Sequence, residues 1–172
     1  MILHQQEVYP APFYYSLMNL LSSHDRVRAL NALCGWDTDG IAQMNREDAR
    51  RVTLDEGELA VAKRRYVQAV KLLCALPGAP TVYYGDEIGM TGMADPWNRA
   101  PMRWDGADES LRAAIAELLN DRRHSAALQT GFLSVTATDA DTLVLRRYWQ
   151  NGLDAFGKRR NGAERSVTVT RK

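Results

Sequence analysis

Apolar residues in the first half of the chain predict two short strands joined by one long helix. Residues 16–21 form an apolar run, and a second run covers residues 80–84; short, bounded apolar runs are typical of buried strands. Between them, apolar residues recur at three- and four-residue intervals over residues 53–76 and mark one helix face. The spacing of Thr53 and Glu56 predicts a capping box at its start. We therefore expect a βαβ unit with parallel strands and a right-handed crossover.

A long polar loop and then a change of pattern follow the second strand. Residues 85–106 are rich in Gly, Pro, Asp and Asn, and loops longer than about 12–15 residues are usually functional or disordered. Residues 110–124 predict a second amphipathic helix. Beyond Gly131 the chain alternates between apolar and polar residues, which predicts antiparallel strands. The predicted strands cover residues 132–136, 142–149 and 166–170. We expect a first domain over residues 1–127 and a β domain over residues 128–172.

Composition narrows the classes of partner. Lys and Arg number 22 and Asp and Glu 21, so the net charge is +1 and no strong field attracts nucleic acid or an anionic membrane. No window approaches the ~18 apolar residues of a membrane span, and the N-terminus lacks a signal-peptide core, so we expect a cytoplasmic protein. Cys34 and Cys74 lie in apolar stretches without metal-ligand spacing, which predicts buried reduced thiols. We expect no metal and no cofactor. Whether the full-length protein forms a homo-oligomer stays open.

The main candidate for chemistry is a His–Asp pair directly after the first strand, His24 and Asp25. The carboxyl ends of parallel strands present ligand-binding groups in α/β folds. An aspartate in this place also commonly caps a helix. By itself the pair leaves both a functional role and a capping role open.

Two longer motifs resemble the α-amylase family of glycoside hydrolases. The strand-seven signature of that family's barrel is similar to residues 16–30, SLMNLLSSHDRVRAL, and its strand-eight region is similar to residues 79–105, APTVYYGDEIGMTGMADPWNRAPMRWD. The second motif most resembles the neopullulanase, cyclomaltodextrinase and maltodextrin-glucosidase group. The resemblance implies an α/β fold: a partial (β/α)8 TIM barrel, with strands 7 and 8 and their helices, followed by a truncated antiparallel β-sandwich domain.

The resemblance implies roles for four side chains, and a fifth, Arg28, is a candidate because it lies one turn after Asp25. Asp25 matches the family's third carboxylate, which binds sugar hydroxyls beside the anomeric carbon and stabilises the oxocarbenium-like transition state of retaining hydrolysis. His24 matches a histidine that hydrogen-bonds the same sugar. Asp95 and Arg99 match loop positions around the glucose units on the non-reducing side, although an ion pair that only holds the loop is equally open. We expect Arg28 either to orient Asp25 or to form a surface pair.

Four other side chains of the second motif belong either to the fold or to the site. Asp86 and Glu87 are expected to be structural, because an acidic pair at a strand end can anchor the following loop through backbone N–H groups. Trp97 and Trp104 either stack on sugar rings or pack in the core.

The same resemblance implies that the chain carries one of three catalytic carboxylates. The family's nucleophile Asp and acid/base Glu, about 5–5.5 Å apart in retaining enzymes, come from strands four and five, and nothing in residues 1–20 resembles those motifs. Residues 4–15, HQQEVYPAPFYY, look like the end of the preceding helix and its connection, so we do not expect Glu7 to be the general acid. We therefore expect an inactive part of a hydrolase that acts on α-glucosidic bonds of maltodextrins, starch, pullulan or cyclodextrins. The alternative is a non-catalytic remnant that serves as a carbohydrate-binding or subunit-contact module.

Overall fold

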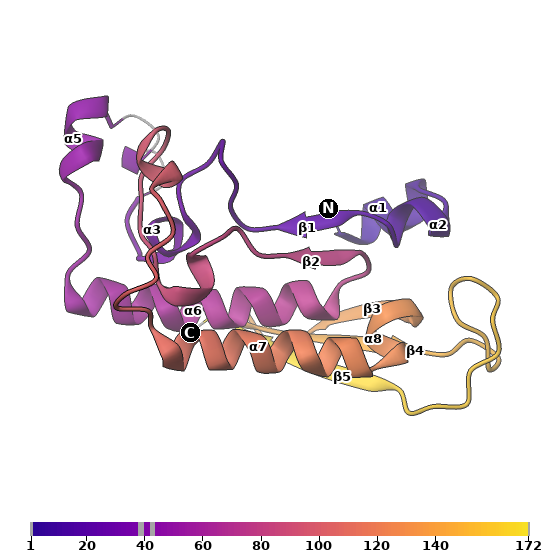
Figure 1. Ribbon diagram of the computed structural model, residues 1–172. Helices are drawn as coiled ribbons and strands as arrows, with labels where there is room; N and C mark the ends of the chain where they lie inside the picture. Colours follow the sequence, from indigo (N-terminus) through magenta and orange to yellow (C-terminus); the bar gives the residue numbers. More distant parts are fainter. Residues whose placement is uncertain (1, 38–39, 42–43, 172) are drawn as a thin grey trace. The chain divides into compact units, whose positions relative to one another are not determined.

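The computed structural model describes residues 2–37, 40–41 and 44–171 and has a mixed α/β fold (Figure 1). The helices are α1 (Ile2–Val8), α2 (Ala11–Tyr14), α3 (Ala29–Leu33), α5 (Arg46–Arg51), α6 (Glu56–Ala75), α7 (Glu109–His124) and α8 (Ala126–Thr130). The strands are β1 (Met18–Leu20), β2 (Ala79–Thr81), β3 (Phe132–Ala137), β4 (Thr142–Tyr148) and β5 (Arg165–Thr170). Two 3-10 turns, η1 (Asp86–Ile88) and η2 (Trp97–Arg99), interrupt the loop after β2.

Contacts divide the chain into two compact units. The first unit comprises Met1–Asn19, Gln68–Thr81 and Ala116–Lys172, and the second unit comprises Leu20–Val67 and Val82–Ile115. The expected domain boundary between residues 127 and 128 falls inside the first unit and stays a prediction. Within the described ranges, no helix is long and apolar enough to cross a membrane.

β1 and β2 pair in a two-stranded sheet, and Figure 1 shows both arrows running in the same direction, as a βαβ unit requires. The backbone N–H of Ala79 donates to the carbonyl of Leu17 at 2.7 Å. Gly78 precedes this contact with a φ of 102°, and a Cβ on it would lie 2.5 Å from the Leu17 carbonyl oxygen, so only glycine fits. Both strands are shorter than predicted: the carbonyl of Tyr84, expected in the second strand, accepts a hydrogen bond from the Arg28 side chain instead.

The helix α6 begins at a capping box two residues beyond the predicted one. The Asp55 Oδ1 atom accepts from the backbone N–H of Glu58 at 2.8 Å, and the Glu58 Oε2 atom accepts from the backbone N–H of Asp55 at 2.9 Å. The box is therefore Asp55–Glu58 and not Thr53–Glu56. An aspartate caps at least as well as a threonine, and its charge also complements the positive end of the helix dipole.

The three predicted strands of the second half are confirmed and form an antiparallel sheet in the order β3-β4-β5. Leu133, Leu145 and Val169, one from each strand, are buried and pack with Ala75 near the end of α6. Since alternate residues of a strand point to opposite faces, this sheet has one apolar face and one polar face.

Two buried arginines of the first unit donate to backbone carbonyls. Arg147 donates to the carbonyl of Ala75 at 2.8 Å and to that of Gly131 at 2.8 and 3.1 Å. Arg122 donates to the carbonyl of Cys74 at 2.7 Å and to that of Leu128 at 2.6 Å. Burial lowers the pKa of both side chains, that of Arg147 to about 10, so both remain charged at neutral pH. They satisfy carbonyls at the C-terminal ends of α6 and α8, where a helix leaves carbonyls without intrahelical partners.

Both cysteines are buried free thiols, as predicted. Burial raises the pKa of Cys74 to about 11. Its thiol is therefore protonated and unreactive at neutral pH.

In the second unit, Asp108 joins the start of α7 to α6. Its carboxylate pairs with Lys63 at 2.6 Å, caps α7 through the backbone N–H of Leu111 at 2.9 Å and accepts from the hydroxyl of Ser110 at 2.7 Å. The hydrogen bond from Lys63, followed by those from Leu111 and Ser110, holds the pKa of Asp108 well below its usual value of 3.8.

We expect the Asp108→Asn substitution to lower the free energy of unfolding at pH 7 and to matter less in acid. A folded-state pKa below the unfolded one means that the folded state binds fewer protons between the two values. The contribution of the carboxylate is therefore complete above about pH 5 and shrinks as the pH falls below 4. Urea unfolding at pH 7 and pH 3 measures the difference, with Glu109→Gln, an exposed neighbour, as control. An Asp108→Asn deficit that is equal at both pH values would contradict this account.

Candidate functional site

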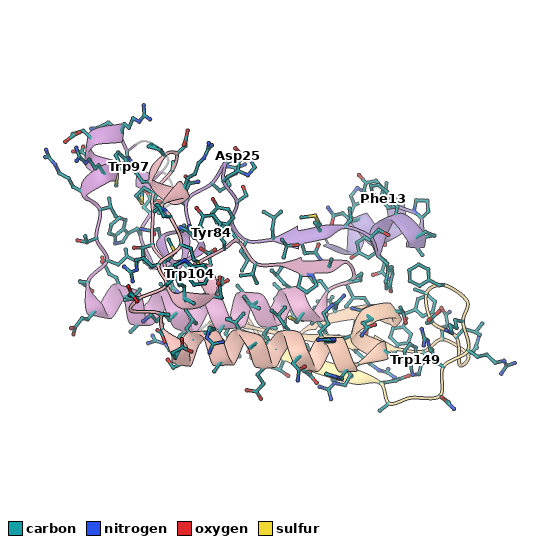
Figure 2. All side chains as sticks on the ribbon, viewed as in Figure 1. Phe13, Asp25, Tyr84, Trp97, Trp104 and Trp149 are labelled. Carbon is teal, nitrogen blue, oxygen red and sulfur yellow. The ribbon has the colours of Figure 1, made fainter. Side chains whose placement is uncertain are left out.

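The loop that follows β1 carries His24 and Asp25, and Figure 2 shows Asp25 at its tip. The His24 Nε2 atom lies 3.2 Å from the Asp25 Oδ2 atom, and the two side chains are 65% and 70% exposed. Helix α3 begins at Ala29 with Arg28 as its N-cap residue, so Asp25 is not a helix cap. The carboxylate is open to a ligand.

The loop that follows β2 brings two more predicted residues to the same place. Arg99 Nε lies 3.2 Å from Asp95 Oδ1, and Arg99 Nη2 lies 3.8 Å from Asp25 Oδ1. The Arg99 Nε–H also donates to the carbonyl of His24 at 3.1 Å. The predicted pair of Asp95 and Arg99 therefore exists, and it joins its own loop to the loop of His24 and Asp25.

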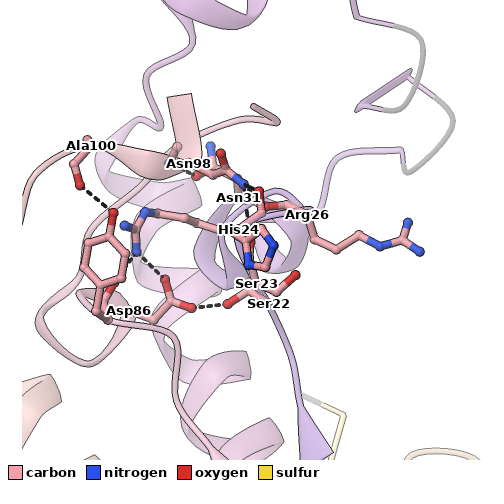
Figure 3. Close-up of polar contacts among 11 residues, drawn as sticks. Ser22, Ser23, His24, Arg26, Asn31, Asp86, Asn98 and Ala100 are labelled. Atoms are coloured by element: carbon pink, nitrogen blue, oxygen red, sulfur yellow. Dashed lines mark hydrogen bonds and ion pairs between the residues drawn. The ribbon is translucent and has the colours of Figure 1, made fainter. Parts of the chain in front are cut away.

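Arg28 occupies a different place from the one predicted. Its side chain is fully buried, and Nη1 donates to the carbonyl of Tyr84 at 2.6 Å and to Asp86 Oδ1 at 2.9 Å; Figure 3 labels Asp86 and draws its contacts as dashed lines. The expectation that Arg28 orients Asp25 or forms a surface pair is wrong. The reason is that the buried carboxylate of Asp86 compensates the guanidinium charge in the interior, and a long side chain one turn after Asp25 can reach it.

Asp86 is structural, as expected, but it contacts the residues after β1 and not the backbone of the loop that follows it: its partners are the side chains of Ser22 and Arg28 and the backbone N–H of Ala29. The Ser22 hydroxyl donates to Asp86 Oδ2, and Arg28 donates to Oδ1. Burial raises the pKa of Asp86 even though these donors oppose the shift. The network ties the residues after β1 to those after β2. The neighbouring Glu87 is half-buried, and its Oε2 atom has no hydrogen-bond partner among the described residues.

Asn98 is a central residue of this site that the sequence analysis missed. It is completely buried, and its Nδ2 atom lies within hydrogen-bond distance of three backbone carbonyls of the His24 loop. Nothing in the sequence distinguishes it from a surface asparagine. Only its place beside Arg99, in the motif that resembles the family, could have drawn attention to it.

The loop of Asn98 is attached at a second point. The Gly92 N–H donates to Asn31 Oδ1 at 2.7 Å, and the Gly92 carbonyl accepts from the backbone N–H of Arg28 at 2.9 Å. A Cβ at position 92 would lie 2.4 Å from the carbonyl oxygen of Trp97. The close approach of these two backbone segments therefore requires glycine.

The two tryptophans of the motif differ in environment. Trp104 is 82% exposed and so is not a core residue. Trp97 is half-buried, and its indole N–H donates to the carbonyl of Arg46 at 3.2 Å, so α5 holds it in place. Stacking of either ring on a sugar stays a prediction.

A hollow of about 400 Å³ lies beside Asp25. Its lining is apolar apart from Asp25 and Arg26 and includes Val27, Ala32, Ile41, Met44 and Ala94. Apolar walls with one carboxylate suit a sugar, which presents C–H groups and hydroxyls. Among the residues that the structure describes, no group of three or more His, Cys, Asp and Glu side chains could hold a metal ion.

The amino-acid sequence is similar to those of several known enzymes. The chain is 36% identical over 152 residues to an amylopullulanase from Thermoanaerobacter thermohydrosulfuricus, which covers 88% of this chain and 10% of that protein. It is 31% identical over 144 residues to a cyclomaltodextrinase from Geobacillus thermopakistaniensis, which covers 80% of this chain and 19% of that protein. No protein-family model matches the chain.

Among solved structures, the ligand-free cyclic α-maltosyl-(1→6)-maltose hydrolase from Arthrobacter globiformis matches with a TM-score of 0.70 and 28% identity, over 98% of this chain and 30% of that one. The chain thus spans less than a third of the length of each of these relatives. The sequence matches and the structural match point to the same group of enzymes, and the chain belongs to the α-amylase family of glycoside hydrolases.

Proposed function

We propose that this chain forms one side of the sugar-binding centre of a retaining α-glucan hydrolase. In this proposal, β1 and β2 are strands seven and eight of a (β/α)8 barrel, residues 1–127 belong to that barrel, and β3, β4 and β5 begin an antiparallel sandwich domain over residues 128–172. The substrates are α-glucan oligosaccharides of the maltodextrin class. The names of the relatives support this, since they act on pullulan and cyclodextrins, and the A. globiformis hydrolase has been solved with maltose.

The observation that carries the proposal is the exposed Asp25 carboxylate, flanked by His24 at 3.2 Å and Arg99 at 3.8 Å. A carboxylate in this position accepts hydrogen bonds from sugar hydroxyls, and its charge stabilises the positive charge that develops on the anomeric carbon. The imidazole of His24 can donate to a hydroxyl of the same sugar. Arg99 lies 3.8 Å from Asp25 and pairs with Asp95, and we propose that the next glucose unit binds beside this pair.

Retaining hydrolysis also needs a nucleophile and a proton donor about 5–5.5 Å apart. We find no candidates for them near Asp25 among the described carboxylates, because Asp95 pairs with Arg99 and Asp86 is buried against Arg28. We therefore propose that this chain alone does not hydrolyse α-glucans, and that an Asp and a Glu from a preceding part of a barrel supply those roles.

A hybrid enzyme tests the proposal. In it, this chain replaces the matching 30% of the A. globiformis hydrolase. We expect the hybrid to hydrolyse cyclic α-maltosyl-(1→6)-maltose, and the 172-residue chain alone to hydrolyse neither maltotriose nor cyclodextrin. Turnover by the purified chain alone would contradict the proposal that the nucleophile and the proton donor come from a preceding part of a barrel. A folded hybrid that binds maltose without turnover would favour the alternative, a non-catalytic carbohydrate-binding or subunit-contact module.

A further inference from the structure

We propose that Asn98 is a positioning residue that fixes the backbone of the His24–Asp25 loop, and through it the place of the Asp25 carboxylate; this inference rests on the proposed function. The carboxylate itself has few restraints. Asp25 is 70% exposed, and its side-chain contacts are with His24, which is also exposed, and with Arg99 at 3.8 Å. Where the carboxylate lies therefore depends on the backbone that carries it.

One buried amide makes three contacts with that backbone, and the Arg99 Nε–H adds a fourth, to the carbonyl of His24. The Asn98 Nδ2 atom lies 2.7 Å from the carbonyl oxygen of Arg26, 2.8 Å from that of His24 and 3.3 Å from that of Ser23. These three carbonyls surround Asp25 in sequence, and Figure 3 shows them converging on the amide. An NH2 group has two hydrogens, so the two short contacts are full hydrogen bonds and the third shares a hydrogen.

The chemistry of the contact requires a neutral donor. Asn98 is completely buried. A missing donor would leave the carbonyl of Arg26 without the hydrogen bond from Asn98, and the carbonyl of His24 would keep only the Arg99 Nε–H at 3.1 Å. An aspartate of the same shape would place a carboxylate against three carbonyl oxygens and would repel them. The Asn98 Oδ1 atom has no hydrogen-bond partner among the described residues, so the donating half of the amide accounts for the contacts observed.

The loop that carries Asn98 is itself held by hydrogen bonds. The loop that carries Asn98 is attached to α3 by Gly92, whose N–H donates to the buried Asn31 and whose carbonyl accepts from the backbone N–H of Arg28. The backbone at Asn98 passes so close to Gly92 that a Cβ on Gly92 would lie 3.1 Å from the Asn98 Cα. The loop that presents the amide is therefore held by its own contacts with α3 and its N-cap residue, and such support favours precise positioning of a catalytic group.

A double-mutant cycle in the hybrid enzyme tests the inference. We expect Asn98→Asp to lower kcat for cyclic α-maltosyl-(1→6)-maltose about 100-fold, because a shift of about 1 Å in a catalytic group has an effect of that size. We expect kcat/KM to fall by a similar factor, since the lost interaction belongs to the transition state. The same substitution should cost less than threefold further in an Asp25→Asn background, because Asn98 acts through Asp25. Asn120→Asp, at an exposed position of α7, is the matched control and should keep the parent kcat.

The outcomes separate this inference from the proposed function. A parent hybrid without turnover contradicts the proposed function, and the inference falls with it. An active parent hybrid in which Asn98→Asp keeps kcat, or loses the same factor with and without Asp25, contradicts the inference alone. If Asn98→Asp does not fold, Asn98→Ser, which keeps one small donor, enters the same cycle. A variant that only lowers the unfolding midpoint, with kcat per folded enzyme unchanged, would assign Asn98 a purely structural role.

Discussion

Replacing Asp25 by Asn in the hybrid enzyme is expected to lower kcat about 1000-fold and to leave the unfolding midpoint unchanged. The loss in rate follows from removing a negative charge beside the developing oxocarbenium ion; deleting one group that stabilises transition-state charge costs on the order of 10²–10³ in kcat. The stability is expected to be unaffected because the side chain is 70% exposed and its ion pairs are at the surface, where such pairs contribute little. Steady-state kinetics and thermal unfolding measure the two effects.

Asp105→Asn is the matched control, since Asp105 is an exposed aspartate of the loop after β2. It should keep both the rate and the midpoint. Equal losses of rate and stability in Asp25→Asn would make Asp25 a structural residue. An unchanged rate would remove Asp25 from the mechanism.

Replacing Arg28 by Met is expected to destabilise the protein by about 3–5 kcal/mol, the usual cost of leaving one partner of a buried ion pair without the other. Arg28 and Asp86 are 0% and 1% exposed, so water cannot replace the lost partner. Burial already raises the pKa of Asp86, and without Arg28 that pKa should rise further. A carboxylate whose folded-state pKa lies above its unfolded one lowers the free energy of unfolding when it is ionised, and protonation of the carboxylate at lower pH removes this loss. The deficit should therefore be smaller at pH 5 than at pH 8.

The companion variant is Arg28→Met combined with Asp86→Leu, which removes both charges. It should recover part of the stability, because paired removal leaves no buried charge. Arg103→Met, at an exposed position, should be nearly neutral. A double variant that is no more stable than Arg28→Met, or a deficit that does not change with pH, would show that the charge of Asp86 is not the cause.

The order of the main elements could be predicted from the sequence because it depends on local patterns. The apolar face of α6, the Pro-Gly sequence after it and the alternating residues of β3, β4 and β5 are visible in the sequence. The start of α6 was misplaced by two residues because Thr53 and Asp55 both begin a spacing typical of a capping box. The helices α1, α2 and α5 are too short, at 7, 4 and 6 residues, to show a full apolar period.

Residues of the site that directly follow a strand end could be predicted from the sequence. Residues whose partners lie far away in the sequence could not. His24 and Asp25 directly follow β1, and the resemblance singled out Asp95 and Arg99; the structure places the four side chains close together, while their roles stay predictions. Arg28 was misplaced because its partner Asp86 is 58 residues away, and no local pattern shows that the two meet in the interior. Asn98 was missed for the same reason, because its partners are backbone carbonyls more than 70 residues away in sequence. Every residue has a backbone carbonyl, so no residue type in the sequence marks these partners.

The most direct test of the central claim, that Asp25 and His24 bind the reacting glucose unit, is a crystal structure of the hybrid enzyme with maltose. The account predicts one glucose ring in the hollow beside Asp25, with ring hydroxyls within 3.2 Å of both the carboxylate and the imidazole, a normal hydrogen-bond distance. Maltose bound elsewhere, with Asp25 contacting only Arg99 and solvent, would contradict it.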